Sequence, residues 1–259
     1  MITETQLKQP RTEAENGTAQ SPQPERVHDY EIPGLVVIIP ALEEAAGIFR
    51  TILELDQELR PYSGKTYLVV NGNSTDGTGR IAHRLGAVVL EQKGVGKGDA
   101  FRQALRHVPE GTKYIVLIDA DFTYPAAHIP EMVNLMESDQ SIGMVSGNRF
   151  GNRKKGELFK RSFYIGNRIL ALVHVVANGV KMQDPLSGLR VVRYDLLRNW
   201  TPKALGFDIE AELNHHIATR GYSIREIPIE FRIRIGVKKL RRRDGFRILH
   251  RMLSQTLAS

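Results

Sequence analysis

Short runs of β-branched residues alternate with segments of helical periodicity through the first half of the chain, and no other feature limits the fold as strongly. The apolar runs, which we expect to be strands, cover residues 35–39, 67–70, 87–90 and 114–118. The segments with helical spacing of apolar residues are 43–59, 78–85 and 98–107. Continuous apolar strands are typical of sheets buried on both faces, and their alternation with helices predicts an α/β fold with a doubly wound sheet. A chain of 259 residues is long enough for one such domain.

The second half of the chain is less regular. We expect helices over residues 159–177 and 208–219 and a strand over residues 224–233. Between them lies a polar segment, Asp184-Pro-Leu-Ser-Gly-Leu-Arg190. The sequence contains no internal repeat, which favours a single domain.

Both ends of the chain differ in composition from the middle. Residues 1–32 are rich in Gln, Glu, Pro, Thr and Ser, so we predict a disordered tail there. Residues 33–237 are predicted to form the α/β domain. Residues 238–259 are predicted to form a basic amphipathic helix, with apolar side chains at Phe246, Leu249, Met252 or Leu253, and Leu257 along one face.

Charge and cysteine content indicate which partners and which cellular compartment are expected for the protein. The net charge of +7 favours anionic partners such as phosphates or anionic lipids. No cysteine occurs, which fits a reducing compartment. The chain shows no signal peptide, and no run reaches the ~18 to 20 apolar residues that span a bilayer. We therefore expect a cytoplasmic protein that associates peripherally with a membrane.

Two aspartates directly follow the most apolar predicted strand. Asp119 and Asp121 are separated by Ala120, so both carboxylates can point toward one ligand. Neighbouring carboxylates repel each other unless a cation joins them, and oxygen ligands of this type suit Mg²⁺ or Mn²⁺. We predict a metal site at Asp119 and Asp121; the alternative is a solvated turn.

Several motifs, in order along the chain, resemble those of family 2 glycosyltransferases. The motifs are Pro40-Ala-Leu-Glu-Glu44, Val69-Val-Asn-Gly-Asn-Ser-Thr-Asp-Gly-Thr78, Gly96-Lys-Gly98, Asp119-Ala-Asp121, Gly147-Asn-Arg149, Ser187-Gly-Leu-Arg190 and Arg234-x-Gly236. More narrowly, residues 35–240 resemble the dolichol-phosphate mannosyltransferase group and its polyprenyl-phosphate sugar-transferase relatives. The resemblance implies a single GT-A domain, in which a Rossmann-like mixed central sheet is flanked by helices. It also implies a hexosyltransferase that inverts the anomeric carbon by a single displacement.

The resemblance assigns roles to particular residues of this sequence. Those implied to bind substrate are Pro40, Ala41, Glu44, Asn71, Asp76, Lys97, Ala120, Arg190 and Lys239. Those implied to take part in catalysis are Asp119, Asp121, Arg149, Asp184 and Arg234. Asp184 is either a general base for a hydroxyl acceptor or, when the acceptor is a phosphate, the residue that orients Arg190 or the acceptor loop. Asp76 and Glu44 also have structural alternatives, as a helix cap and as a carboxylate in the first turn of a helix.

Some positions depart from the family pattern and leave the donor open. Asn71 and Gly72 stand where relatives usually carry two aspartates, so the nucleotide is either GDP or UDP. Thr123 stands where the mannosyltransferases often place Gln, which weakens mannose as the sugar. Glu43 and Lys238 also differ from the usual Asn and Ser.

The expected acceptor is a polyprenyl phosphate at the cytosolic face of a membrane. The chain would reach that membrane through its basic helix or by docking on a small membrane anchor subunit; the alternative for the basic helix is that it packs on the domain with an exposed basic edge. The apolar run of residues 169–177 resembles the acceptor helix of the family, and its alternative is a place in the core. The alternative enzyme transfers sugar to a soluble or saccharide hydroxyl. We expect no nucleic-acid partner, because the basic terminus lacks interleaved aromatic residues. A sugar nucleotidyltransferase is disfavoured because no glycine-rich phosphate loop follows Pro40.

Overall fold

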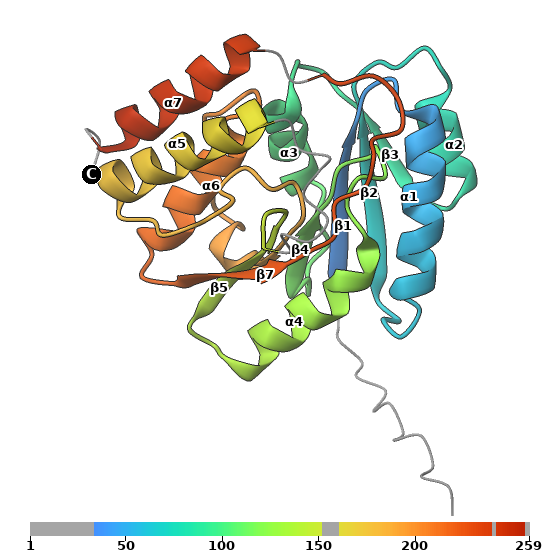
Figure 1. Ribbon diagram of the computed structural model, residues 1–259. Coiled ribbons are helices and arrows are strands. Elements are labelled where there is room, and N and C mark those ends of the chain that lie inside the picture. Colours follow the sequence, from blue (N-terminus) through green and yellow to red (C-terminus); the bar gives the residue numbers. More distant parts are fainter. Residues whose placement is uncertain (1–33, 152–160, 240–241, 257–259) are drawn as a thin grey trace, which may run out of the picture.

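A mixed sheet forms the centre of the protein (Figure 1). The computed structural model describes residues 34–151, 161–239 and 242–256, so the expected tail at residues 1–32 lies outside the described residues. Seven strands are found in the described part of the chain, in the spatial order β3-β2-β1-β4-β6-β5-β7. They are β1 (Leu35–Ala41), β2 (Lys65–Asn71), β3 (Val88–Glu91), β4 (Tyr114–Leu117), β5 (Ile142–Asn148), β6 (Arg190–Arg193) and β7 (Ser223–Pro228).

Helices cover both faces of this sheet, as a doubly wound fold requires. The helices are α1 (Ala45–Glu58), α2 (Thr78–Arg84), α3 (Lys97–Leu105), α4 (Ile129–Ser138), α5 (Arg161–Asn178), α6 (Ile209–Ala218) and α7 (Arg242–Thr256), with short 3-10 turns η1 (Ala126–His128) and η3 (Tyr194–Leu196). Residues of α1, α2 and α4 share one apolar core with the sheet, and residues of α3 and α6 share the other. The expected α/β fold with a mixed, doubly wound sheet is confirmed.

The strand directions gather several loops at one edge of the sheet. Strands β3, β2, β1 and β4 are parallel, whereas β6 runs antiparallel to both β4 and β5. The carboxyl ends of β1, β2 and β4 therefore lie side by side, which is where open α/β sheets bind ligands. The segments that follow these ends are 42–44, 72–76 and 118–121.

Helices α5 and α7 form an outer layer on α6. Ile248 and Met252 of α7 are buried together with Ala211 of α6, and Leu170 and Val173 of α5 pack against them. In Figure 1 the two helices lie next to each other, away from α1 and α2. In the part of the chain that the structure describes, no helix combines the length and apolar character needed to cross a bilayer.

Several elements differ from the sequence-based expectation. Strands β5 and β6 and helix α4 were not expected. The strand expected at 224–233 ends at Pro228, and Pro40 lies inside β1 rather than after it, where it pairs with Val70 of β2. Proline at this position is tolerated because β1 continues for only one more residue.

Candidate active site

Asp119 and Asp121 lie just beyond the carboxyl end of β4, and a cationic side chain contacts each of them. Lys97 Nζ lies 2.6 Å from Asp119 Oδ1. Arg234 donates a hydrogen bond from Nη1 to Asp121 Oδ2. The two predicted metal ligands therefore each pair with a cation from a different segment of the chain.

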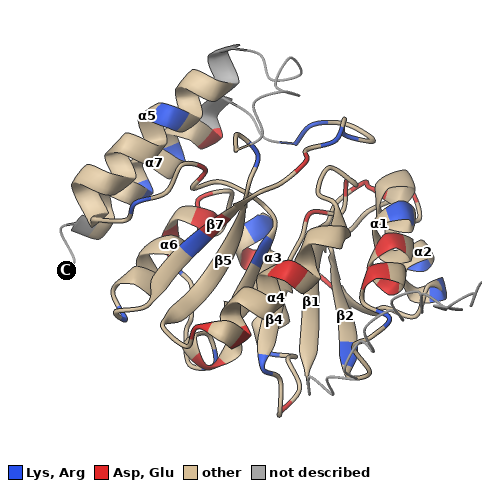
Figure 2. Cartoon of the chain, turned by 60° about the horizontal axis from the view of Figure 1, so that its bottom comes forward, with Lys and Arg blue, Asp and Glu red and all other residues tan. Residues whose placement is uncertain are grey.

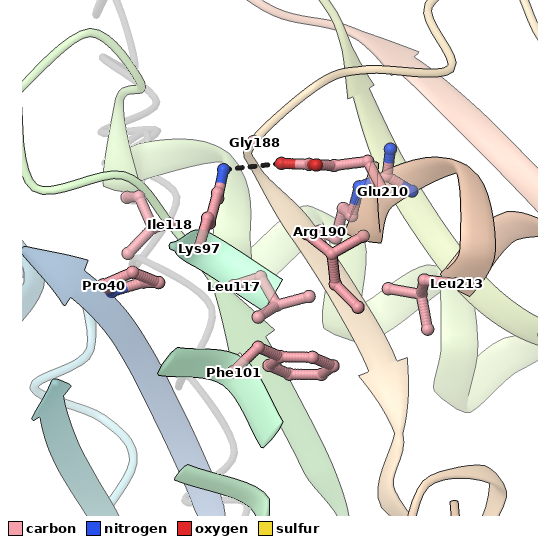
Figure 3. Close-up of a pocket in the computed structure, with 10 residues that line it drawn as sticks. Pro40, Lys97, Phe101, Leu117, Ile118, Gly188, Arg190, Glu210 and Leu213 are labelled. Atoms are coloured by element: carbon pink, nitrogen blue, oxygen red, sulfur yellow. Dashed lines mark ion pairs between the residues drawn. The ribbon is translucent and has the colours of Figure 1, made fainter. Parts of the chain in front are cut away.

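Lys97 also contacts a carboxylate that the sequence analysis missed. Its ammonium lies 2.6 Å from Glu210 Oε1, an ion pair seen in Figure 3, and also 2.6 Å from Asp119 Oδ1. Lys97 therefore bridges α3, α6 and the end of β4. Burial acts against the charged form of Lys97, but the carboxylates of Asp119 and Glu210 raise its pKa above the usual value. In the sequence, Glu210 could have been noticed as a site residue because it and Asp208 place two carboxylates at the start of the helix expected over residues 208–219.

Asp121 is the more enclosed member of the pair. Its side chain is 4% exposed, and burial, followed by the negative charge of Asp119, raises its pKa. Thr123 donates to Asp121 Oδ1 from its backbone N–H, at 3.1 Å, and from its hydroxyl, at 2.5 Å. The negative charges of Asp119 and Asp121 therefore repel each other, and a cation bound by both carboxylates would stabilise their charged forms.

Glu44 joins this cluster from the segment after β1. Arg234 donates to Glu44 Oε1 as well as to Asp121, and Lys239 Nζ lies 3.6 Å from the same Glu44 oxygen. Burial raises the pKa of Glu44 to about 7, although Arg234 and Lys239 favour its charged form. Glu44 Oε2 is buried without a hydrogen-bond partner among the described residues. A buried, unpartnered carboxylate oxygen indicates a position where a ligand can bind.

Residues 229–239, which follow β7, cross the end of the sheet; we call this segment the strap. Its backbone donates from Arg232 N to Thr123 O, at 2.9 Å, and from Ile235 N to Asp121 O, at 3.2 Å. The cavity at this edge, which Pro40 and Lys97 help to line, has a volume of about 20 Å³. That volume suits about one water molecule, so this cavity is too small to hold a nucleotide sugar.

Asn71 and Asp76 hold the loop after β2 in place. Asn71 Nδ2 donates to Glu91 Oε2 at 2.8 Å. Asp76 accepts the backbone N–H of Ala45 at 2.9 Å, and also the backbone N–H and hydroxyl of Thr78. Asp76 therefore caps the start of α1 from a neighbouring loop, which corresponds to the structural alternative for this residue. The side chain of Asn71 is buried at the end of β2.

Arg149 and Asp184 form a buried ion pair near Asp119. The guanidinium donates from Nε and Nη2 to the two carboxylate oxygens of Asp184, both at 2.7 Å. Glu226 accepts the backbone N–H of Asp184 at 2.8 Å and so fixes the loop that carries it. Asp184 pairs with Arg149 and does not contact Arg190, so the expectation that it orients Arg190 directly is wrong. A role of Asp184 toward an acceptor loop stays a prediction.

Arg190 is fully buried and holds the loop that precedes it. It donates to the carbonyl oxygens of Ser187, at 2.8 Å, and Pro185, at 2.7 Å, and to the side chain of Asn214. These contacts occupy both sides of the guanidinium, and they account for its burial. Arg190 also lines the small cavity beside Lys97.

The remaining predicted site residues belong to the backbone around the acidic pair. Ala41 and Ala120 are buried at the ends of β1 and β4. Gly96 and Gly98, which flank Lys97, lie against the backbone of residues 204–205: an added Cβ would lie 2.2 Å from Leu205 O or Ala204 O. An added Cβ at Gly188 would lie 2.4 Å from Asp119 Oδ2, so this glycine makes room for the carboxylate.

The donor set around the acidic pair fits a hard divalent cation. Asp119 and Asp121 offer carboxylate oxygens, and Glu44 Oε2 is a further oxygen without a hydrogen-bond partner among the described residues. The described residues contain no group of three or more His, Cys, Asp and Glu side chains placed to hold a metal ion. A cation bound here would therefore need additional oxygen ligands, such as the phosphates of a substrate or water.

Comparison with known sequences shows the family. Residues 36–201 match the model of glycosyl transferase family 2. The chain is 31% identical to the dolichyl-phosphate hexose transferase of Haloferax volcanii over 214 residues, which cover 82% of this chain and 89% of that protein. It is 30% identical over 196 residues to glycosyltransferase AglJ of the same organism, covering 75% of this chain but only 62% of AglJ.

A solved structure shares the fold. The glucosyl-3-phosphoglycerate synthase of Mycobacterium tuberculosis, in complex with Mn²⁺, UDP-glucose and phosphoglyceric acid, superposes with a TM-score of 0.66 at 22% identity, covering 86% of this chain and 80% of that one. At this identity the likeness concerns the fold alone, and the expected GT-A architecture is confirmed.

Proposed function

Because this chain belongs to glycosyltransferase family 2, we propose that it transfers a hexose from a nucleoside diphosphate sugar to a polyprenyl phosphate at a membrane surface. The observation that carries this proposal is the cluster of Asp119, Asp121 and Glu44 at the carboxyl ends of the parallel strands, where each carboxylate contacts Lys97 or Arg234. Such an arrangement of opposite charges suits a substrate that brings its own phosphates and a cation.

Binding of the donor would replace the ion pairs within this cluster by contacts with the metal ion and the diphosphate. Asp119 and Asp121 would hold Mg²⁺ or Mn²⁺, which when bound neutralises the charge that develops on the departing nucleoside diphosphate. Lys97 and Arg234 would then contact the diphosphate in place of the aspartates, since both are donors that suit phosphate oxygens. The complex of the synthase with Mn²⁺ and UDP-glucose, on the same fold, supports a metal-dependent donor site.

A phosphate acceptor fits the environment of Asp184. A hydroxyl acceptor needs a general base, whereas a phosphate is already anionic near neutral pH and needs mainly to be positioned. Asp184 is fully buried, and Arg149 occupies both of its carboxylate oxygens. That pairing disfavours Asp184 as a base and leaves the displacement to positioning and stabilisation of the leaving group. The similarity to a dolichyl-phosphate hexose transferase supports the same acceptor class.

The outer helices support a membrane surface as the place of reaction. Along α5, apolar side chains are exposed at helical spacing, at Ile165, Ile169, Leu172 and Val176. On α7, Phe246 and Leu253 are exposed, 76% and 51%, while Met252 is buried. Of the two alternatives for the apolar face of this helix, Leu253 lies with the exposed Phe246, whereas Met252 packs inward; Leu257 lies outside the described residues. Arg168 of α5 and Arg247 of α7 are exposed, and Figure 2 shows basic residues on both helices. Basic side chains beside exposed apolar ones favour an anionic lipid surface.

The test is a transfer assay with a panel of donors. Purified protein is incubated with UDP- and GDP-linked hexoses and a polyprenyl phosphate, with and without Mn²⁺, and lipid-extractable sugar is measured. We expect transfer from one donor class that requires the metal and falls at least about a hundredfold in Asp121→Asn. Asp195→Asn, which changes an exposed aspartate outside the site, serves as the control.

Two outcomes would contradict the proposal. Transfer to a saccharide hydroxyl but not to the lipid phosphate would favour the alternative acceptor. Full activity of Asp121→Asn would remove the acidic pair from the mechanism.

A further inference from the structure

A second hollow, far from the acidic cluster, is lined by three arginines and the only tryptophan of the chain. It has a volume of about 210 Å³, and Arg102, Arg106, Arg198 and Trp200 contribute to its wall. A single water molecule needs only ~10–15 Å³, so the hollow has room for a polyatomic ligand. It is also much larger than the cavity beside Lys97.

The position of the hollow separates it from the proposed donor site. Arg102 lies in the last turn of α3 and Arg106 follows that helix, whereas Lys97 is at the other end of α3. With a rise of ~1.5 Å per residue, Arg106 lies roughly 13 Å along the helix axis from Lys97. Arg198 follows β6, whose last residue pairs with the first residue of β4, at the edge of the sheet opposite Asp119.

The charges around the hollow are only partly balanced. Arg102 pairs with Asp99 at 2.5 Å. Across residues 34–151, 161–239 and 242–256, neither Arg106 nor Arg198 pairs with a carboxylate; Arg198 lies over the ring of Tyr194, 5.7 Å from its centroid. Guanidinium groups that share a hollow repel one another, so an anion bound among them would lower the free energy of the cluster.

A structural role explains only part of this cluster. The C-terminus of a helix carries partial negative charge and attracts cations, which accounts for Arg102 and Arg106. Arg198 comes from a different segment, so this effect does not account for its side chain lining the same hollow. Trp200 is held in the wall by stacking on His216, with ring centroids 4.1 Å apart, and by an edge contact with Phe101.

We propose that this hollow binds a phosphate group, supplied either as inorganic phosphate or as the phosphate end of a nucleotide. Guanidinium groups bind phosphate oxygens through paired hydrogen bonds, and three of them converging from two segments offer donors on more than one side of the ligand. The site is separate from the proposed donor site, and it does not depend on the transfer reaction.

Trp200 allows a direct test, because every change in tryptophan fluorescence reports on this hollow. The full-length protein, without metal, is titrated with inorganic phosphate at constant ionic strength, against chloride as the reference. We expect a saturable change in Trp200 emission. Removing a charged hydrogen-bond donor weakens binding about tenfold or more, so the apparent Kd for phosphate should rise by that factor in Arg198→Ala and in Arg106→Ala.

Matched variants separate this site from other anion effects. Arg84→Ala removes an exposed arginine from the last turn of α2, a comparable helix position, and should bind phosphate like the parent protein. Asp119→Asn should also bind normally, because the acidic cluster lies elsewhere. A parallel titration with UDP distinguishes the two sources. Tighter binding of UDP than of phosphate, weakened in Arg198→Ala but not in Asp119→Asn, identifies a nucleotide, and equal or weaker binding identifies free phosphate. A change that does not saturate, or one that is the same in Arg198→Ala as in the parent, would overturn the proposal.

Discussion

Lys97 is shared by two carboxylates, and this sharing determines how strongly Asp119 can bind anything else. Its ammonium is equally close to Asp119 and to Glu210, at 2.6 Å. Glu210 thus competes with Asp119 for the positive charge of Lys97. Without that competition Lys97 would neutralise Asp119, and a divalent cation would lose much of the attraction of this ligand.

Substitution of Glu210 tests this argument. We expect Glu210→Gln to raise the Mn²⁺ concentration needed for half-maximal activity by about tenfold, the effect of losing one charge-assisted interaction. Direct Mn²⁺ binding to the protein, measured by calorimetry, should weaken by a similar factor. Glu212→Gln is the control on the same helix, because Glu212 accepts the backbone N–H groups of Lys203 and Ala204 and contributes to stability. Equal Mn²⁺ binding in Glu210→Gln and the parent would refute the competition.

His174 is a buried histidine whose protonation should limit stability in acid. Its side chain is fully buried on α5, and burial, followed by the charge of Arg190, lowers its pKa to about 4. The pKa of His174 in the folded protein is lower than the ordinary value near 6.5, which applies to the unfolded chain. Above pH 6.5 the imidazole is neutral in both states, so its contribution to the free energy of unfolding is fully present there. This contribution is lost as the pH falls from about 6.5 to 4.

The consequence is measurable by denaturant unfolding at several pH values. Between pH 7.5 and pH 5 we expect His174 to lower the free energy of unfolding by about 1–2 kcal/mol. In His174→Gln this part of the pH dependence should disappear, even if the variant is less stable at every pH. A variant with the same slope as the parent would show that other groups cause the acid sensitivity.

At the scale of elements, the strap places a cationic side chain in the proposed donor site. Arg234 on the strap contacts Glu44 and Asp121, and the strap backbone donates to the carbonyl groups of Asp121 and Thr123. Arg232, on the same segment, pairs with Glu54 of α1 instead. Arg234 therefore holds a position beside Asp121 that a metal ion would need.

Arg234→Ala should separate metal binding from catalysis. Asp121 loses its cationic partner and remains close to Asp119, so we expect Mn²⁺ to bind about tenfold more tightly in the absence of donor. Activity should fall, because the guanidinium is also the proposed ligand of the diphosphate. Arg232→Ala serves as the control and should leave Mn²⁺ affinity unchanged. Weaker Mn²⁺ binding in Arg234→Ala would contradict the view that Arg234 and the cation compete.

The elements that could be predicted from sequence are those whose pattern is local. The continuous apolar runs of β1 and β4 are enough to predict these strands. The position of Asp119 and Asp121 at the end of the sheet follows from the prediction of β4. Strand β5 could not be recognised, because Gly143 and Gly147 interrupt it. These glycines leave room for side chains from β7 and its flanks: an added Cβ would meet Tyr222 or Ile229 at 2.7 or 2.6 Å.

The site was predictable to the same extent. Position after a buried strand is a local signal, and it singled out the acidic pair. The contact of Lys97 with Glu210 joins α3 to α6, and the pairing of Arg149 with Asp184 joins two distant loops. Such pairings depend on how the helices and loops pack on the sheet, which no spacing along the chain encodes.

At the scale of the whole molecule, the proposed donor site and the proposed membrane-facing helices lie in different places. The donor site lies at the strand ends, and α5 and α7, which carry exposed apolar side chains, form an outer layer next to α6. Figure 1 shows this arrangement of the helices. Removing α7 would be a poor test of membrane binding. Ile248 and Met252 are buried against the domain, so a chain cut before α7 would expose its own core.

Point substitutions on α5 avoid that problem. Leu172 and Val176 are 64% and 78% exposed, so Leu172→Glu with Val176→Glu should leave the fold intact. Inserting either side chain into a membrane stabilises binding by at most about 1.5–3 kcal/mol, and added negative charge is repelled by anionic lipid. We therefore expect cosedimentation with anionic liposomes to fall at least about tenfold. Leu53→Glu changes a half-exposed leucine on α1 and should bind liposomes like the parent. If the double variant and the parent cosediment equally, these helices do not form the membrane face, and a partner protein becomes the better explanation of their exposed apolar residues.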